Sequence, residues 1–180
     1  MFKVAITGNI ASGKSAVEKI LESKGFKVYD TDKIAHEILE NSSEVKQAFG
    51  TTDRKKIAAV VFSDSEKLKL LESIIHPSVK DELNKIFLTD LQIVFISVPQ
   101  LFETGFDKFF DKIIYVTAER QICLERLMKR NSLSKEEALK RINAQKEDQK
   151  LEKSDFVVEN NFDLANLEVQ VEKVLSILVR

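Results

Sequence analysis

Short apolar blocks alternate with stretches of helical periodicity along most of the chain. Five blocks have the length of buried strands, and each ends near a polar or turn residue; they cover residues 2–7, 26–29, 91–98, 113–116 and 156–158. Apolar blocks separated by helical stretches are typical of an α/β domain whose strands are parallel. The pattern therefore predicts a doubly wound parallel sheet of about five strands.

Two of the helical stretches have a clear apolar face. Val17, Ile20 and Leu21 share a face of the helix that follows the first strand, and Gly25 is predicted to stop this helix. The last stretch has apolar residues at positions 164, 167, 171, 174, 175 and 178. This is the spacing of an amphipathic helix that faces a core, and we expect it to serve packing alone.

Residues 33–89 form a long insertion between the second and third predicted strands. The insertion contains no convincing strand but several helical periods, built on Ile57, Val60, Val61, Leu68, Leu71 and Ile75. A simple crossover between parallel strands is much shorter. We therefore expect an all-helical subdomain, able to cover a substrate, within a single folding unit of residues 1–180.

The composition limits the class of protein. A chain of 180 residues with 43% hydrophobic and 32% charged residues is typical of a globular domain. Its 28 basic and 29 acidic side chains leave a net charge of −1, so no overall field attracts nucleic acid or an anionic membrane. We expect neither partner, and we expect any anionic substrate to be bound by local charge.

Cysteine and histidine are scarce. The one cysteine, Cys123, excludes an internal disulfide framework and a cysteine-based zinc site, and two histidines offer little to a metal cluster. Leu124 and Leu127 lie near Cys123 on one side of its helix, so we expect an inert core thiol. No signal-peptide pattern opens the chain, and no apolar run approaches the ~18 residues of a transmembrane helix. We expect a cytoplasmic protein that is a monomer or a weak homo-oligomer.

The segment from Gly8 to Ser15 reads GNIASGKS and fits the pattern GxxxxGK[ST]. It lies directly between an apolar strand and a helix, as a phosphate-binding loop must, and this setting argues against an accidental match. In such a loop, backbone N–H groups and the positive end of the helix face the β-phosphate. The lysine reaches the β- and γ-phosphates, and the serine hydroxyl binds Mg²⁺.

The loop therefore predicts an ATP site, with Lys14 on the phosphates and Ser15 as a ligand of Mg²⁺. Glycines at positions 8 and 13 are expected to let the backbone approach an anion that a Cβ atom would obstruct. The residues expected to bind the nucleotide here are Gly8, Asn9, Ala11, Ser12, Gly13, Lys14, Ser15 and Ala16.

Two carboxylates, Asp30 and Asp32, follow the second strand at the edge that carries the phosphate loop in a doubly wound sheet. We favour Asp32 as the general base toward an acceptor hydroxyl, with the other carboxylate holding Mg²⁺ through water or orienting the site. The alternative is structural. In that interpretation Asp32 caps a helix that starts at Lys33, and Asp30 is a turn residue.

A third carboxylate, Glu103, follows the third strand at the same edge. Glu103 either contacts the substrate or a water molecule bound to magnesium, or is a solvated loop residue without such a role.

The dipeptide His76-Pro77 interrupts the helices of the insertion. A helix end followed by proline in a new first turn accounts for this dipeptide, and a histidine that binds a ligand is the alternative.

Asn160 and Asn161 follow the last strand, where a loop can pack on adenine, although asparagine also favours turns.

Three arginines, at positions 126, 130 and 141, flank a turn at 131–134 that joins two predicted helices. Ser134 and Glu137 in this segment form a capping box. A helical pair of this kind can close as a lid and bring cations to the transferring phosphoryl group. Each arginine is alternatively a surface charge, and Arg141 is spaced to pair with Glu137 on a helix.

Together these residues resemble the dephospho-coenzyme A kinase family, whose members complete coenzyme A by phosphorylating its ribose 3′-hydroxyl. The resemblance runs through almost the whole chain. Beyond the phosphate loop it includes YDTD at 29–32, Arg54 ahead of a helix, IHP at 75–77, VPQLFE at 98–103, the stretch from Arg130 through Arg141 to Gln145, and SDFVVENN at 154–161. This ordered series is far more specific than the loop alone.

The resemblance implies a P-loop kinase core, a helical coenzyme-binding region at 33–89 and a lid at 126–150. It implies catalysis by Asp32, Lys14 and Arg141, with Asp32 as the base for the acceptor hydroxyl and dephospho-coenzyme A as its source. Contacts with the coenzyme are implied for Asp32, His76, Leu101 and Glu103, and a contact with adenine for Asn160 or Asn161. The chain departs from the family where glycine is common at Asn9, Ala11 and Phe162, and leucine at Gln100.

Other nucleotide-binding classes fit less well. A kinase acting on a nucleoside monophosphate is a rival with the same core. A GTP-binding switch needs an Asn-Lys-x-Asp segment, but Asn84-Lys85-Ile86 continues to Phe87. A remodelling ATPase needs a carboxylate at the end of a strand such as 93–98, which ends without one. A nucleotide-binding module without turnover also remains open at this point.

Overall fold

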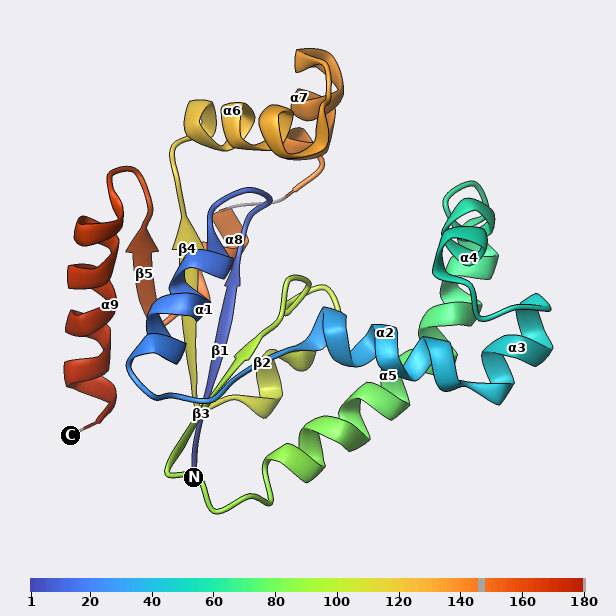
Figure 1. The fold of residues 1–180 in the computed structure, drawn as a ribbon, viewed down its shortest axis with the longest axis horizontal. Helices are drawn as coiled ribbons and strands as arrows, with labels where there is room; N and C mark the ends of the chain where they lie inside the picture. The colour runs from blue at the N-terminus through green and yellow to red at the C-terminus, as the bar shows by residue number, and fades with distance from the viewer. Residues whose placement is uncertain (146–147, 180) are drawn as a thin grey trace. The chain divides into compact units, whose positions relative to one another are not determined.

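The computed structural model describes residues 1–145 and 148–179, which form two compact units. The first unit comprises Met1–Tyr29 and Leu91–Arg180, and the second comprises Asp30–Asp90. The first unit contains nearly all of the sheet and the helices that cover it, whereas the second is built from helices (Figure 1). Each unit is therefore described by its own elements.

The sheet has five strands in the order β2-β3-β1-β4-β5. Strand β1 pairs in parallel with both β3 and β4, and β4 pairs in parallel with β5. The predicted α/β fold with a five-stranded doubly wound sheet is confirmed, because the strand that opens the chain lies in the centre of the sheet. The bounds of the strands are β1 Phe2–Gly8, β2 Val28–Asp30, β3 Ile93–Ser97, β4 Lys112–Thr117 and β5 Phe156–Glu159.

The helices of the first unit follow the strands and the loops between them. Helix α1 ends where the sequence predicts, since Gly25 has a left-handed φ of 87° and its N–H donates to the Glu22 carbonyl oxygen. The helices are α1 Lys14–Ser23, the 3₁₀ turn η1 Phe106–Phe109, α6 Arg120–Asn131, α7 Lys135–Asn143, α8 Asp148–Glu152 and α9 Leu164–Leu178.

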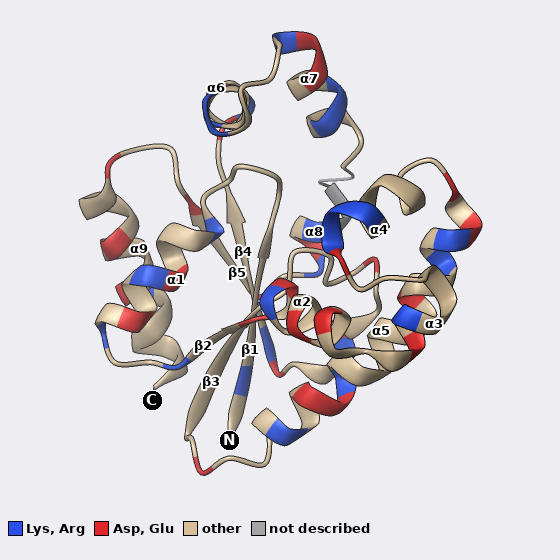
Figure 2. Cartoon of the chain, turned by 45° about the vertical axis from the view of Figure 1, so that its right-hand side comes forward, with Lys and Arg blue, Asp and Glu red and all other residues tan. Residues whose placement is uncertain are grey.

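Helices α1 and α9 lie side by side in both ribbon views and form a core with the sheet (Figures 1 and 2). Ile20 and Leu21 of α1 pack in the same buried cluster as Leu167 and Val171 of α9. The strands contribute Val4, Ile6, Phe95, Ile114, Val116 and Val158 to this cluster. The packing role predicted for both helices is confirmed, and the core fixes the start of α1 above the sheet.

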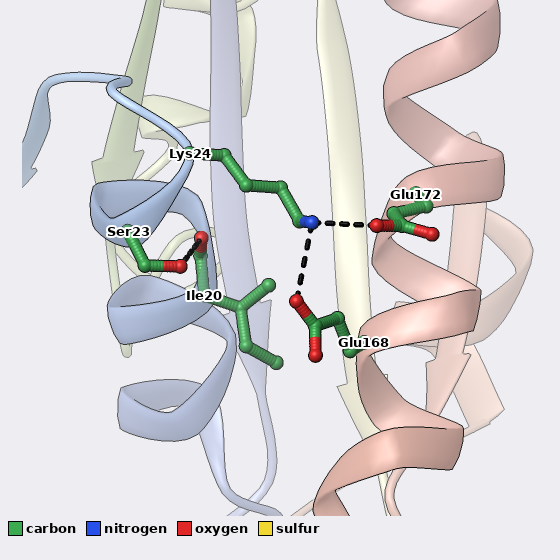
Figure 3. A network of polar contacts seen from close by, with 5 residues as sticks. All are labelled: Ile20, Ser23, Lys24, Glu168 and Glu172. Atoms are coloured by element: carbon green, nitrogen blue, oxygen red, sulfur yellow. Dashed lines mark hydrogen bonds and ion pairs between the residues drawn. The ribbon is translucent and has the colours of Figure 1, made fainter.

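A polar contact joins the C-terminal end of α1 to the first half and middle of α9 (Figure 3). The ammonium group of Lys24, just after α1, lies 2.6 Å from Glu172 and 3.2 Å from Glu168, which are one turn apart on α9. The hydrogen bond with Glu172 is the largest cause of a raised pKa for Lys24, and Glu168 adds to it. This ion-pair network therefore stabilises the α1–α9 contact while Lys24 is protonated.

We expect the substitution Lys24→Met to lower the free energy of unfolding at neutral pH and to have no such effect in strong alkali. A raised folded-state pKa contributes stability that is complete below the unfolded value of 10.5 and is lost as pH rises through the higher folded value. Urea titrations of wild type and variant across this range measure the difference. The ionic origin would be contradicted if wild type and variant differed in free energy of unfolding by the same amount at neutral pH and well above pH 10.5. It would also be contradicted if salt did not reduce this difference.

The second unit consists of four helices with a polar side chain at each start. The carboxylates of Asp53 and Asp64 accept hydrogen bonds from backbone N–H groups in the first turns of α4 and α5. The bonds from Lys56 and Lys67 hold the pKa of Asp53 and Asp64, respectively, below its usual value. The helices, each with its capping residue, are α2 Thr31–Asn41 (Asp30), α3 Ser43–Phe49 (Ser42), α4 Arg54–Val61 (Asp53) and α5 Ser65–Ile86 (Asp64).

Most charged residues lie on the helices and loops, and the strands carry Lys3, Asp30, Lys112 and Glu159. Basic and acidic positions alternate along the helices of the second unit, as Figure 2 shows for α3 and α5. This distribution agrees with the nearly balanced count of 28 basic and 29 acidic residues. Among the described residues, every helix falls short of the combined length and hydrophobicity that a bilayer crossing demands.

The interpretation of His76-Pro77 as a helix end is wrong. Helix α5 runs from Ser65 to Ile86 with Pro77 inside it. Proline removes one N–H from the helical ladder and usually breaks a helix. Here Ile75, Val79 and Leu83 are buried at helical spacing on both sides of the proline, so packing maintains the helix through it.

The capping residue of α2 also differs from the alternative considered for Asp32. The helix begins at Thr31, and the carboxylate of Asp30 accepts a hydrogen bond of 2.8 Å from the Asp32 N–H. Asp30 is therefore the N-cap, and Asp32 lies in the first turn with an exposed side chain. The structural role proposed for Asp32 belongs to Asp30, which leaves the Asp32 carboxylate outside the cap.

Candidate active site

The segment between β1 and α1 has the backbone of a tight loop. Gly13 at the start of α1 has a left-handed φ of 99°, and Ala11 has a φ of 60°. A Cβ atom at Gly13 would overlap the Asn160 side chain, and one at Gly8 would overlap the Val116 carbonyl oxygen. The sequence predicted that these glycines make room for an anion. In the structure, the atoms that exclude a Cβ belong to the protein itself.

Three polar side-chain atoms at the end of β1 and in this segment are buried without a hydrogen-bond partner among the described residues. They are Thr7 Oγ1, Asn9 Oδ1 and Ser12 Oγ. Leaving such an atom unsatisfied costs about 1–3 kcal/mol. A cluster of three at the end of a central strand indicates a site that is completed by a ligand or by water.

Lys14 and Ser15 occupy the first turn of α1, where backbone N–H groups of the helix face outward. The ammonium group of Lys14 donates a hydrogen bond of 3.2 Å to the Gly8 carbonyl oxygen, so the lysine lies over its own loop. The side chain of Ser15 is exposed at this end of the helix. Both residues lie where the sequence places them.

The residues at this end of α1 suit a divalent metal that is held together with a phosphate ligand. Among residues 1–145 and 148–179, no three His, Cys, Asp or Glu side chains are grouped as a metal site would require. Mg²⁺ is typically held by one or two protein oxygens, waters and the phosphates of a nucleotide. The exposed hydroxyl of Ser15 is suited to that arrangement.

The other face of the loop contacts the end of β5 and helix α6. Asn160 Nδ2 donates a hydrogen bond of 2.9 Å to the Ser12 carbonyl oxygen, and Arg126 Nη1 donates to the same oxygen at 3.4 Å. Asn160 is 7% exposed. Its neighbour Asn161 accepts a hydrogen bond from the Glu119 N–H instead. Of the two asparagines, only Asn160 therefore touches the phosphate loop.

Gln145 makes a second contact with the loop that the sequence did not predict. Its side-chain oxygen accepts a hydrogen bond of 2.7 Å from the Ile10 N–H. This bond spans 135 positions in the sequence, so no local pattern points to it. It links the end of the predicted lid, 126–150, to the loop; residues 146–147 of that range lie outside the described residues.

Helices α6 and α7 form the pair predicted for the lid. The capping box is confirmed, since Ser134 and Glu137 exchange hydrogen bonds at the start of α7. The Ser134 N–H is the main cause of a lowered pKa for Glu137, and Arg141 adds a smaller electrostatic effect. Arg141 itself is exposed on α7 and Arg130 donates to Asn131, whereas Arg126 donates to the Ser12 carbonyl oxygen of the loop.

Glu103 is neither alone nor fully solvated. Its carboxylate lies 2.6 Å from the Lys150 ammonium group, whose side chain is only 5% exposed, while that of Glu103 is 49% exposed. Lys153 lies over the Phe102 ring at 5.7 Å. Two lysines of the α8 region thus hold the loop after β3. No local pattern points to Lys150, because its partner lies 47 positions earlier in the chain (150 minus 103).

Comparison with known proteins identifies the family. The dephospho-CoA kinase family model matches residues 2–166. A dephospho-CoA kinase of Fusobacterium nucleatum is 42% identical over 184 residues, which cover 94% of this chain and 95% of the relative. This chain belongs to the dephospho-CoA kinase family. The resemblance drawn from the sequence motifs is confirmed.

Solved structures agree with this assignment. The dephospho-CoA kinase from Campylobacter jejuni is 31% identical, has a TM-score of 0.76 and matches over 98% of this chain and 96% of its own. A protein from Thermus thermophilus is 38% identical, with a TM-score of 0.87 and coverage of 98% and 97%. The dephospho-CoA kinase fold therefore extends over almost the whole chain, and the GTP-switch and remodelling-ATPase interpretations fall away.

The remaining predicted site residues are distributed over both units. Asp32, on the first turn of α2, and His76, half-buried within α5, belong to the second unit. Leu101 belongs to the first unit and is fully buried. Their predicted contacts with the coenzyme remain predictions, as does the catalytic role of Arg141.

Proposed function

We propose that this chain transfers the γ-phosphoryl group of ATP to the ribose 3′-hydroxyl of dephospho-coenzyme A. Membership of the dephospho-CoA kinase family supports the acceptor. The observation that carries the donor is the loop between β1 and α1, where Asn9 Oδ1 and Ser12 Oγ, like Thr7 Oγ1 at the end of β1, are buried without a partner in the described structure. A polyphosphate is the ligand that such a loop is suited to complete.

In this proposal the loop holds the donor. The N–H groups at the start of α1 and the Ser12 hydroxyl bind the phosphates, and Lys14 leaves the Gly8 carbonyl to contact the γ-phosphate. Ser15 would hold Mg²⁺, which would neutralise part of the charge of the phosphates. Of these groups only Lys14 has to move when the ligand binds, and the folded start of α1 lowers the cost of ordering the others.

Asp32 is proposed to accept the proton of the attacking hydroxyl, and Arg141 to stabilise the charge of the transferring group. The exposed Asp32 carboxylate is not used as a helix cap, since Asp30 has that role. Arg141 lies on α7, in the predicted lid. Closure of the lid would exclude water, which otherwise competes as an acceptor for the phosphoryl group. We further propose that the enzyme works in the cytoplasm as a monomer or weak homo-oligomer.

Incubation with ATP, Mg²⁺ and dephospho-coenzyme A is expected to yield coenzyme A, heavier than its precursor by one phosphoryl group. Mass spectrometry of the product, with digestion to locate the phosphate on the ribose, measures this. Reactions lacking ATP, and reactions with a nucleoside monophosphate in place of the coenzyme, serve as controls. Phosphorylation of the nucleoside monophosphate alone by well-folded protein would sink the proposed acceptor.

A further inference from the structure

The Ser12 carbonyl oxygen lies at the centre of a hydrogen-bond network on the side of the phosphate loop that faces the protein. Asn160 Nδ2 and Arg126 Nη1 both donate to it, at 2.9 and 3.4 Å. Asn160 follows strand β5, and Arg126 lies in the middle of helix α6. Neither residue belongs to the strand–loop–helix segment that defines the site, so the loop is held by two other elements of the same unit.

Both ends of the Asn160 side chain are used in this network. Arg126 Nη2 donates to the Asn160 backbone oxygen at 3.0 Å and to its Oδ1 at 3.4 Å. The Asn160 N–H donates to the Thr117 carbonyl oxygen at 2.8 Å. The amide is also wedged against Gly13, where a Cβ atom would overlap Nδ2. Asn160 is therefore fixed by its backbone, its amide and its packing.

The geometry of the Ser12–Gly13 peptide bond links the hydrogen bonds of the Ser12 oxygen to the direction of the Gly13 N–H. In a trans peptide, the carbonyl oxygen and the N–H of the next residue point in opposite directions. Holding the Ser12 oxygen against Asn160 and Arg126 thus aims the Gly13 N–H away from them. Gly13 is the N-cap of α1, so this N–H belongs to the helix end that attracts an anion.

We propose that Arg126 and Asn160 form a phosphate-loop clamp, a pair of positioning residues that aims the Gly13 N–H at the phosphates of the donor. The clamp rests on the proposed function only in that the loop binds a triphosphate. Its effect does not depend on the adenine base, because the hydrogen bonds described for the clamp join its two residues to each other, to the loop and to β4. The clamp also joins the loop to α6, the helix from which the predicted lid continues.

This role differs from the adenine contact that the family resemblance implies for Asn160. The Asn160 side chain is only 7% exposed, and its amide already bonds the Ser12 oxygen and Arg126, so little of it is accessible to a base. A contact of Asn160 with adenine and a clamp on the loop therefore predict different losses of ligand affinity when Asn160 is replaced. An adenine contact affects ATP alone, whereas the clamp affects every ligand with a triphosphate group.

The test compares Asn160→Ala and Arg126→Ala with wild type in the binding of ATP and of inorganic tripolyphosphate by calorimetry. We expect each variant to bind both ligands about tenfold more weakly, the size expected for one lost hydrogen bond near a charged ligand, with the ratio of the two affinities unchanged. Lys129→Ala, an exposed lysine of the same helix, is the matched control and is expected to bind as wild type. Thermal unfolding shows that each variant is folded.

Two further measurements keep the proposal open to refutation. If an alanine variant does not fold, Asn160→Ser and Arg126→Lys replace it. The Gly13 amide resonance in an ¹⁵N spectrum is expected to shift in the clamp variants and not in Lys129→Ala. Loss of ATP affinity with unchanged tripolyphosphate affinity would overturn the clamp in favour of an adenine contact, and unchanged affinity for both would overturn it outright. Failure to form coenzyme A would instead count against the acceptor alone, since neither ligand contains it.

Discussion

Asp32→Asn is expected to lower kcat for coenzyme A formation by about 100- to 10,000-fold while ATP binds with nearly wild-type affinity. Asparagine keeps the size of the side chain but cannot accept the proton of the attacking hydroxyl. The start of α2 should persist, because the cap is Asp30 and not Asp32. Steady-state kinetics with both substrates and calorimetric titration with ATP separate the two effects.

The control for this variant is Glu37→Gln, which removes an exposed carboxylate from the same helix. It is expected to leave kcat and both KM values within about twofold of wild type, as surface substitutions usually do. A kcat for Asp32→Asn close to that of the control would remove Asp32 as the base. A loss of ATP affinity equal to the loss of kcat would instead assign it to donor binding.

Lys14→Ala is expected to impair both steps, with kcat lowered about 100- to 1,000-fold and ATP binding weakened. The ammonium group lies over the loop, 3.2 Å from the Gly8 carbonyl oxygen, and is placed to meet phosphate charge without reorganisation of the backbone. Charge stabilisation of the transferring group is the largest contribution that the protein makes to phosphoryl transfer. Single-turnover kinetics and ATP titration measure the two losses.

Lys19→Ala removes an exposed lysine from the same helix and serves as the matched control. Near-normal turnover by the Lys14 variant, with the control also normal, would mean that the loop holds ATP without its lysine. The contrast between Asp32→Asn and Lys14→Ala is itself informative, since only the second is expected to weaken the donor.

Features set by local pattern could be predicted from the sequence, and features set by tertiary contacts could not. The strands, the loop at 8–15 and the capping box at Ser134 each depend on neighbouring residues, and all are present. The helix end predicted at His76-Pro77 is wrong, because buried residues on both sides of Pro77 stabilise α5 as one continuous helix. Local preference alone would break the helix at this proline. In that case tertiary packing outweighs intrinsic propensity.

The site shows the same division. The position of Lys14 and Ser15 at the start of α1 could be predicted from the motif, but the partners of the loop come from far along the chain. Asn160 lies 148 positions from Ser12, and Gln145 lies 135 from Ile10. A single sequence carries no sign of such pairs, because each residue taken alone fits a turn or a helix surface. The ion pair of the buried Lys150 could not be predicted either, because its partner Glu103 is also distant in the sequence.

The packing around Gly8 and Gly13 has a consequence for how mutational tolerance should be interpreted. A methyl group at either position would collide with Val116 or Asn160 whether or not a nucleotide is present. Both glycines are therefore constrained by folding as well as by catalysis. A descendant of this chain that had lost all activity would still be under pressure to keep them. The spacing of glycines in such a descendant would record its ancestry, whereas changes at Lys14 and Asp32 would record the loss of the enzyme.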